Sequence, residues 1–309
     1  MGQVIFHHYP QSPVSEKVRV AFGIKGLAWK SVTIPRIPPK PELMPLTGGY
    51  RRTPVMQVGA DIYCDSQGIL RELERRFPEP SLLPGDSGGM PWAVSRWSDG
   101  PMLDLAVRIV LGAQAEELPA DFAADRGRLY LGPDWDLKAA GADLPHLTAQ
   151  LRGQLGWIEQ RLAGGRPFIL GDQPTLPDVL VYYLVWFIRG RWAGGPDLLA
   201  ELAALEAWEA RVEAIGHGSS EDLEAGDALA IARDAEPQTP EAGDPRDPQG
   251  LAPGQAVTVV PEGDGGDPEV TGRIRSVDRE TVAILREDAR VGRVCVHFPR
   301  VGYRVTVVG

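Results

Sequence analysis

Two different spacings of apolar residues follow one another along the first 78 residues of the chain. Val14, Val18 and Phe22 recur at helical spacing, and so do Ile69 and Leu73 further along. Four short runs of β-forming residues predict strands, at residues 4–9, 30–35, 54–58 and 61–64. Since strands and helices alternate, we expect a small mixed α/β domain with the order β-α-β followed by β-β-α.

Strand patterns are absent from the next part of the chain, residues 89–235, and helical patterns replace them. Leu147, Leu151 and Leu155 form one apolar stripe along a predicted helix. Residues 176–189 are apolar nearly all round, which is typical of a helix at the centre of a bundle. This region is therefore expected to be an all-helical domain.

The pattern changes twice more towards the C-terminus. Residues 218–235 fit one further amphipathic helix, and residues 236–250 are crowded with prolines and acids, which predicts a solvated linker. Five runs of β-forming residues follow within 251–309, at 256–260, 269–277, 281–286, 293–297 and 303–308. Strands this short favour a small SH3-like β-barrel, because closure of the sheet removes exposed edges. We expect residues 1–235 to fold without this domain, because the linker is polar.

Charge, cysteine content and hydropathy exclude several classes of protein. The net charge of −10 and the lack of a basic face argue against nucleic-acid binding. The longest apolar run, 179–188, is about half the length of a membrane-spanning helix, and no signal peptide opens the chain, so a cytoplasmic protein is expected. The two cysteines, Cys64 and Cys295, have no neighbours at ligand spacing, so neither a disulfide framework nor a metal site is expected.

Three short segments in the N-terminal domain resemble the glutathione transferase family in order and spacing. They are residues 9–19, 51–56 and 64–69. In the first segment Ser12 lies six residues before Val18, as in theta-like and zeta-like members. The second segment is similar to the "V-P-x-L" motif with its cis proline, and the third is similar to "E-S-x-x-I".

The resemblance implies an architecture and a set of partners. It implies a thioredoxin-like glutathione-binding domain over 1–78 and the family's all-helical domain over 89–235, where Thr175 and Asp178 match a helix-capping pattern. It further implies glutathione as co-substrate, a small electrophile as second substrate, a role of the detoxification type, and a homodimer in which Asp99 or Asp104 reaches the neighbouring glutathione. It says nothing about 251–309.

The catalytic group implied by the resemblance is Ser12. The thiol of glutathione has a pKa near 8.5, so an enzyme has to stabilise the thiolate near neutral pH. The Ser12 hydroxyl can donate to the sulfur, and a helix that begins at Pro13 directs its positive end there. Ser12 could instead simply cap that helix. Tyr9 and Ser15 are the alternatives, Tyr9 because other classes of the family use a tyrosine near this strand end.

The second and third segments supply candidate groups for binding the tripeptide. A cis peptide before Pro54 would expose the backbone of Thr53 to the cysteinyl unit of glutathione. Asp65 can take the ammonium of the γ-glutamyl end, while Ser66 and free amides at the start of a helix can take its carboxylate. An Asp-Ser pair of this kind is also a common N-cap.

Further candidates come from the resemblance but have ordinary explanations as well. Arg51 and Arg52 could bind the glycyl carboxylate, or they could lie in a solvated turn. Trp97 and Met102 are candidates for the apolar pocket of the second substrate, although such residues in helices are usually core.

The sequence is therefore consistent with two classes of function. The first is an enzyme that activates glutathione for attack on an electrophilic carbon, with glutathione-dependent isomerisation or reduction as variants. Thiol-disulfide exchange by the protein itself is disfavoured, because positions 12 and 15 are serines. The second is a non-catalytic binding or assembly module whose C-terminal β domain recruits a partner.

Overall fold

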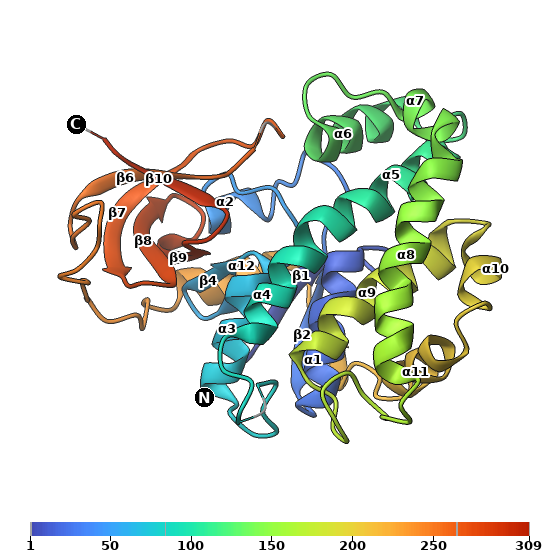
Figure 1. Ribbon diagram of the computed structural model, residues 1–309. Coiled ribbons are helices and arrows are strands. Elements are labelled where there is room, and N and C mark those ends of the chain that lie inside the picture. The colour runs from blue at the N-terminus through green and yellow to red at the C-terminus, as the bar shows by residue number, and fades with distance from the viewer. Residues whose placement is uncertain (1, 84, 264, 309) are drawn as a thin grey trace.

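The computed structural model describes residues 2–83, 85–263 and 265–308, and its first unit is the expected mixed α/β domain (Figure 1). Its elements are β1 (Ile5–His8), α1 (Pro13–Ile24), β2 (Ala28–Thr33), α2 (Met44–Thr47), β3 (Val55–Val58), β4 (Asp61–Cys64) and α3 (Ser66–Arg76). β1 pairs in parallel with β2 and antiparallel with β3, which pairs with β4. The predicted strands and the two predicted helices are confirmed, and α2 is a short addition in the Pro-rich loop.

The helical part of the chain consists of helices, of which the first two are joined by a π-helical turn, η1. Its elements are α4 (Met90–Trp97), η1 (Ser98–Met102), α5 (Leu103–Ala113), α6 (Ala120–Leu131), α7 (Leu137–Ala142), α8 (Leu144–Leu162), α9 (Leu176–Arg191), α10 (Gly195–Leu199) and α11 (Ala203–Glu213). α9 is buried along most of its length and packs against α1, as expected for the central helix. The Thr175 amide donates to Asp178 Oδ2 at 2.8 Å, so the predicted capping contact is present. Within the described residues, none of the helices has the length and apolar character that crossing a bilayer requires.

The segment 218–235 differs from the single helix expected there. It forms a strand, β5 (Ser219–Asp222), and then a shorter helix, α12 (Ala225–Arg233). β5 pairs in parallel with β2 and so extends the N-terminal sheet. Gly218, with φ of 70°, lies so close to β2 that a Cβ there would be 2.2 Å from the Leu27 carbonyl oxygen. Pairing with an open sheet edge therefore overrides the local helical pattern.

The five strands predicted at the C-terminus are confirmed, and they form an antiparallel sheet that curls beside the N-terminal unit (Figure 1). They are β6 (Ala256–Pro261), β7 (Val270–Val277), β8 (Thr281–Asp288), β9 (Gly292–Pro299) and β10 (Tyr303–Val307). β9 also pairs in parallel with β4 of the N-terminal unit. The edge of the β domain is thus covered by a strand from elsewhere in the chain, and one ten-stranded sheet runs through both parts.

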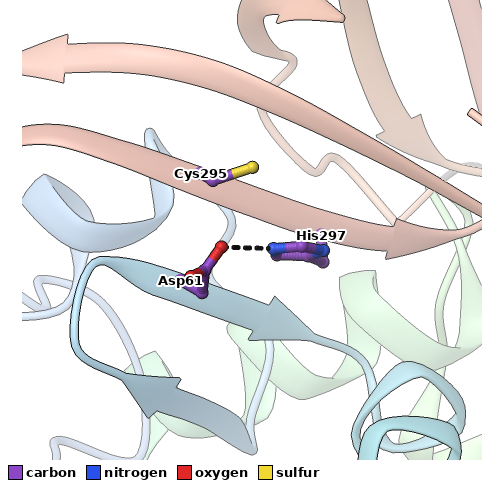
Figure 2. A group of neighbouring side chains, drawn as sticks. All are labelled: Asp61, Cys295 and His297. Carbon is purple, nitrogen blue, oxygen red and sulfur yellow. Dashed lines mark hydrogen bonds and ion pairs between the residues drawn. The ribbon is translucent and has the colours of Figure 1, made fainter. Parts of the chain in front are cut away.

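The junction between β4 and β9 holds a cluster of buried polar side chains (Figure 2). His297 Nε2 lies 3.0 Å from Asp61 Oδ1, and the Thr239 hydroxyl donates to the same oxygen at 2.6 Å. Cys295 lies beside them, with the ligand atoms of the three residues drawn in the figure within 4.8 Å of one another. The backbone N–H of Gln238 donates to the other oxygen of Asp61 at 2.7 Å.

The segment expected to be a solvated linker is mostly exposed but is held in place. Besides the bonds of Gln238 and Thr239 to Asp61, the amide of Ala242 donates to the Arg275 carbonyl at 3.2 Å. The apolar core beneath is also shared, since Ile5, Val55 and Ile62 of the N-terminal sheet belong to one cluster with residues of the β domain such as Val296 and Phe298. This shared core argues against the expectation that residues 1–235 fold without the β domain.

Candidate functional site

A cavity of about 120 Å³ lies where the N-terminal unit meets α5 and α6. It brings together residues that were singled out in the sequence: Tyr9, Arg52, Thr53, Pro54, Asp65, Ser66 and Asp99. The fold explains this, because the end of β1, the approach to β3 and the start of α3 all meet at one end of the sheet. Lys17, Arg126 and Tyr130 also line the cavity and had not been predicted as site residues.

The approach to β3 has the backbone that the resemblance implied, since the Thr53–Pro54 peptide is cis. Lys40 Nζ donates to the Thr53 hydroxyl and to the Arg51 carbonyl, at 2.8 Å each. Burial, together with the charge of Arg126, lowers the pKa of Lys40 to about 7. Lys40 was missed, because a lone lysine in a Pro-rich loop gives no sequence signal.

Asp65 caps α3 in a strained backbone conformation. Its φ of 69° is the only positive value at a non-glycine position among the described residues, and its side chain accepts from the Gln67 amide at 2.8 Å. Such a conformation costs about 1–3 kcal/mol and persists only where the surroundings impose it. A carboxylate held in this way at the cavity is consistent with a binding role in addition to capping.

Ser12 and Ser15 have different surroundings from Tyr9. Ser12 is the N-cap of α1, where its Oγ accepts from the Ser15 amide at 3.1 Å, and its side chain does not line the cavity. Ser15 is fully buried, and its hydroxyl has no hydrogen-bond partner within the described residues. The Tyr9 hydroxyl accepts from Arg126 Nη2 at 3.2 Å, and Tyr9 lines the cavity.

Arg51 and Arg52 both pair with carboxylates of the chain itself. Arg51 Nη1 pairs with Asp125 of α6. Arg52 Nη2 donates to Asp267 of the β domain at 2.6 Å. Both arginines thus form intramolecular ion pairs, and their role in binding the glycyl carboxylate stays a prediction.

A second cavity of about 80 Å³ adjoins the first and is mostly apolar. Its apolar side chains come from α5, α6 and α9 and include Val107, Val110, Leu111, Phe122 and Phe187. Tyr9, Arg126 and Tyr130 line both cavities. A thiol bound in the first cavity near Tyr9 would thus be next to an apolar compartment.

Trp97 and Met102 lie elsewhere and line neither cavity. Trp97 Nε1 donates to Gln154 of α8 at 2.8 Å, and Met102 is fully buried in the helical core. Both residues thus pack against other helices, as is usual for such residues. The sequence could not show this, because the packing of the other helices decides which face of a helix meets the cavity. The residues that do line the second cavity have the same apolar spacing as core residues, so their sequence carries no distinguishing signal.

Asp99, which was expected to reach the glutathione of a neighbouring protomer, lines the first cavity of its own chain. Its carboxylate accepts from Lys17 Nζ at 2.6 Å, from the Ser95 hydroxyl at 2.7 Å and from the Tyr183 hydroxyl at 2.8 Å. Asp104 pairs with Arg108 one helical turn away at 2.8 Å. Asp99 thus lines the cavity, but its carboxylate is already paired with Lys17.

Comparison with known proteins agrees with this architecture. The glutathione S-transferase N-terminal domain model matches residues 6–81, and the glutathione S-transferase C-terminal domain model matches residues 115–211. The crystal structure of a GST-like protein from Pseudomonas syringae is 33% identical, covers 100% of both chains and has a TM-score of 0.79. The chain belongs to the glutathione S-transferase family.

Two proteins of known class are more distantly similar. A maleylacetoacetate isomerase from Pseudomonas aeruginosa is 28% identical over 216 residues, which are 65% of this chain and 84% of that protein. A zeta-class glutathione S-transferase from Euphorbia esula is 33% identical over 84 residues, which are 26% of this chain and only 36% of that protein. These similarities favour glutathione-dependent chemistry of the transferase or isomerase kind.

Proposed function

We propose that this protein is a glutathione transferase that activates the thiolate of glutathione for attack on an electrophilic carbon. The observation that carries the proposal is the meeting of Thr53, Pro54, Asp65 and Ser66 at one cavity that adjoins an apolar compartment. In this proposal the backbone of Thr53 pairs with the cysteinyl unit, and Asp65 and Ser66 hold the γ-glutamyl end. The sulfur then points to the shared wall of the two cavities.

The thiolate needs a donor at that wall, and the geometry favours Tyr9 over Ser12. The Tyr9 side chain lines both cavities, whereas the Ser12 oxygen accepts a bond inside the cap of α1 and lines neither. The Arg126 guanidinium beside the Tyr9 hydroxyl adds positive charge where the thiolate forms. The N-terminus of α1 contributes a smaller attraction of about 0.3–1 kcal/mol. Ser12 and Ser15 remain the alternatives.

The apolar compartment has a cationic border, which indicates an electrophile that carries an anionic group. Arg36, Arg126 and Arg191 line it, and within the described residues Arg36 and Arg191 have no carboxylate partner. Burial and the nearby charges of Arg126 and Arg191 lower the pKa of Arg36, so an anion bound there would relieve mutual repulsion. This observation favours, as a second candidate, isomerisation of an unsaturated acid by addition and loss of the glutathione sulfur.

Calorimetric titration with glutathione, followed by assays with paired neutral and carboxylated electrophiles, tests the proposal. We expect binding in the micromolar to millimolar range and faster turnover of the carboxylated member of each pair. No binding of glutathione in calorimetry, with no rise in Tm at millimolar ligand, would refute the enzymatic proposal and leave the non-catalytic binding module.

The remaining parts of the proposal rest on the family resemblance. They are a cytoplasmic location and assembly into a homodimer. Sedimentation velocity at micromolar protein concentration tests the second directly, and a single monomeric species would contradict it.

A further inference from the structure

The β domain reaches the candidate glutathione site at two points. Asp267, in the segment between β6 and β7, pairs with Arg52. Tyr303, the first residue of β10, donates its hydroxyl to Asp65 Oδ2 at 3.0 Å. The domain therefore contacts two side chains that were expected to hold opposite ends of the tripeptide.

The pair between Arg52 and Asp267 is bidentate, and its carboxylate is withdrawn from solvent, whereas the Arg52 side chain is 32% exposed. Arg52 Nε lies 3.1 Å from both oxygens of Asp267, and Arg52 Nη2 lies 2.6 Å from Oδ2. The Asp267 side chain is only 5% exposed. Burial acts to lower the pKa of Arg52, but the hydrogen bonds and the charge of Asp267 outweigh it and hold this pKa above its ordinary value. The fork of the guanidinium is thus already occupied by a carboxylate.

Arg51 and Arg126 beside this pair also contact carboxylates of the chain. Arg51 pairs with Asp125 and lies 3.5 Å from Asp267, and Arg126 Nη1 lies 3.2 Å from Asp125. Three guanidiniums therefore share two carboxylates. Two of these three positive charges are therefore balanced by carboxylates of the chain itself. Burial, together with the charge of Arg126, lowers the pKa of Lys40 to about 7, so Lys40 carries less positive charge near neutral pH than an ordinary lysine.

The γ-glutamyl end, in contrast, has a carboxylate that is fixed and available. Asp65 accepts from the Tyr303 hydroxyl through one oxygen and from the Gln67 amide through the other. A further cavity of about 220 Å³, between Asp65, Asp99 and the β9–β10 turn, continues the site on this side. An ammonium group bound here would face Asp65, whereas Asp99 beside it is already paired with Lys17.

We propose that Asp267 is a specificity-determining residue, through which the β domain makes this site select a thiol peptide by its γ-glutamylcysteinyl part rather than by a free glycyl carboxylate. The inference rests on the proposed function and deepens it. Asp267 repels a carboxylate that approaches Arg52 but does not repel an ester or an amide. The ligand class is therefore γ-glutamylcysteinyl thiols, whether the C-terminal carboxylate is free, esterified or amidated.

The test compares glutathione with its glycyl ethyl ester by calorimetry on the full chain. For the unmodified protein we expect the two Kd values to agree within about threefold. Asp267→Asn keeps the shape and one hydrogen-bond acceptor but removes the charge, so glutathione should then bind about tenfold more tightly than the ester. Glu269→Gln is the matched control, because it removes the same charge from an exposed position two residues away, and it should leave the ratio unchanged.

The outcomes separate this inference from the function on which it rests. A strong preference of the unmodified protein for glutathione, or an unchanged ratio in Asp267→Asn, would overturn it while the proposed function survives. If neither ligand binds to any variant, both proposals fail. If Asp267→Asn does not fold, the ratio in the unmodified protein still decides, and Arg52→Gln, which leaves the Asp267 charge without its partner, should then weaken glutathione more than the ester.

Discussion

Replacing Tyr9 by phenylalanine should raise the pKa of the bound glutathione thiol. The change removes the hydroxyl that lies 3.2 Å from Arg126 Nη2 at the wall shared by the two cavities. A hydrogen bond to a charged group contributes about 1.5–3 kcal/mol, and one pKa unit corresponds to about 1.4 kcal/mol. The expected rise is therefore about one to two units, and it is measured by following the ultraviolet absorbance of the bound thiolate against pH.

Ser12→Ala is the matched comparison, because it removes a hydroxyl from the neighbouring N-cap. Loss of a cap costs about 0.5–2 kcal/mol of stability, so Tm should fall while the thiol pKa changes little. The reverse result, a raised pKa in Ser12→Ala and none in Tyr9→Phe, would refute the choice of Tyr9 and make Ser12 the donor. If neither variant changes the pKa, Ser15→Ala is the next to be examined by the same titration.

Three further predictions follow from the contacts described above. Asp61→Asn should destabilise the protein by about 1–3 kcal/mol in urea unfolding at pH 7, because it disrupts the junction of β4 and β9. Burial acts to raise the pKa of Asp61, but its bonds to His297, Thr239 and the Gln238 amide hold it below the ordinary value. The stability that Asp61 contributes is therefore present above its unfolded pKa of about 3.9 and is lost as the pH falls through the folded pKa. In Asp61→Asn the free energy of unfolding, measured in urea, should not show this loss at low pH. Deleting residues 240–309 should leave a chain that aggregates, because β4 loses β9 and the shared core is exposed; a soluble fragment with a cooperative melt would contradict this. Arg36→Gln should raise KM about tenfold for carboxylated electrophiles and leave KM for neutral ones unchanged; equal effects on both would remove Arg36 from the second-substrate site.

The elements that could be predicted from the sequence are those specified by local patterns. The strands at 54–58 and 61–64 and the helix begun by Ser12 and Pro13 each carry their own signal in spacing, capping or turn residues. The same is true of Thr53, Pro54, Asp65 and Ser66, whose place at one end of the sheet follows from the order of the strands. Residues 219–222 could not be placed in this way, because their strand exists only through pairing with β2.

The contribution of the β domain to the site could not be predicted from local sequence patterns, for a different physical reason. Antiparallel strands joined by turns reveal their partners in the sequence, whereas the parallel pair of β4 and β9 joins segments with no turn between them. One signal was nevertheless present, since Val294, Cys295 and Val296 form a continuous apolar run, which is typical of a strand covered on both faces. In the structure all three are fully buried. A strand with such a run is not suited to the exposed edge of a small independent domain. Once β9 is fixed against β4, the segment between β6 and β7 and the start of β10 contact Arg52 and Asp65, so the domain that stabilises the sheet also sets the charge of the ligand site.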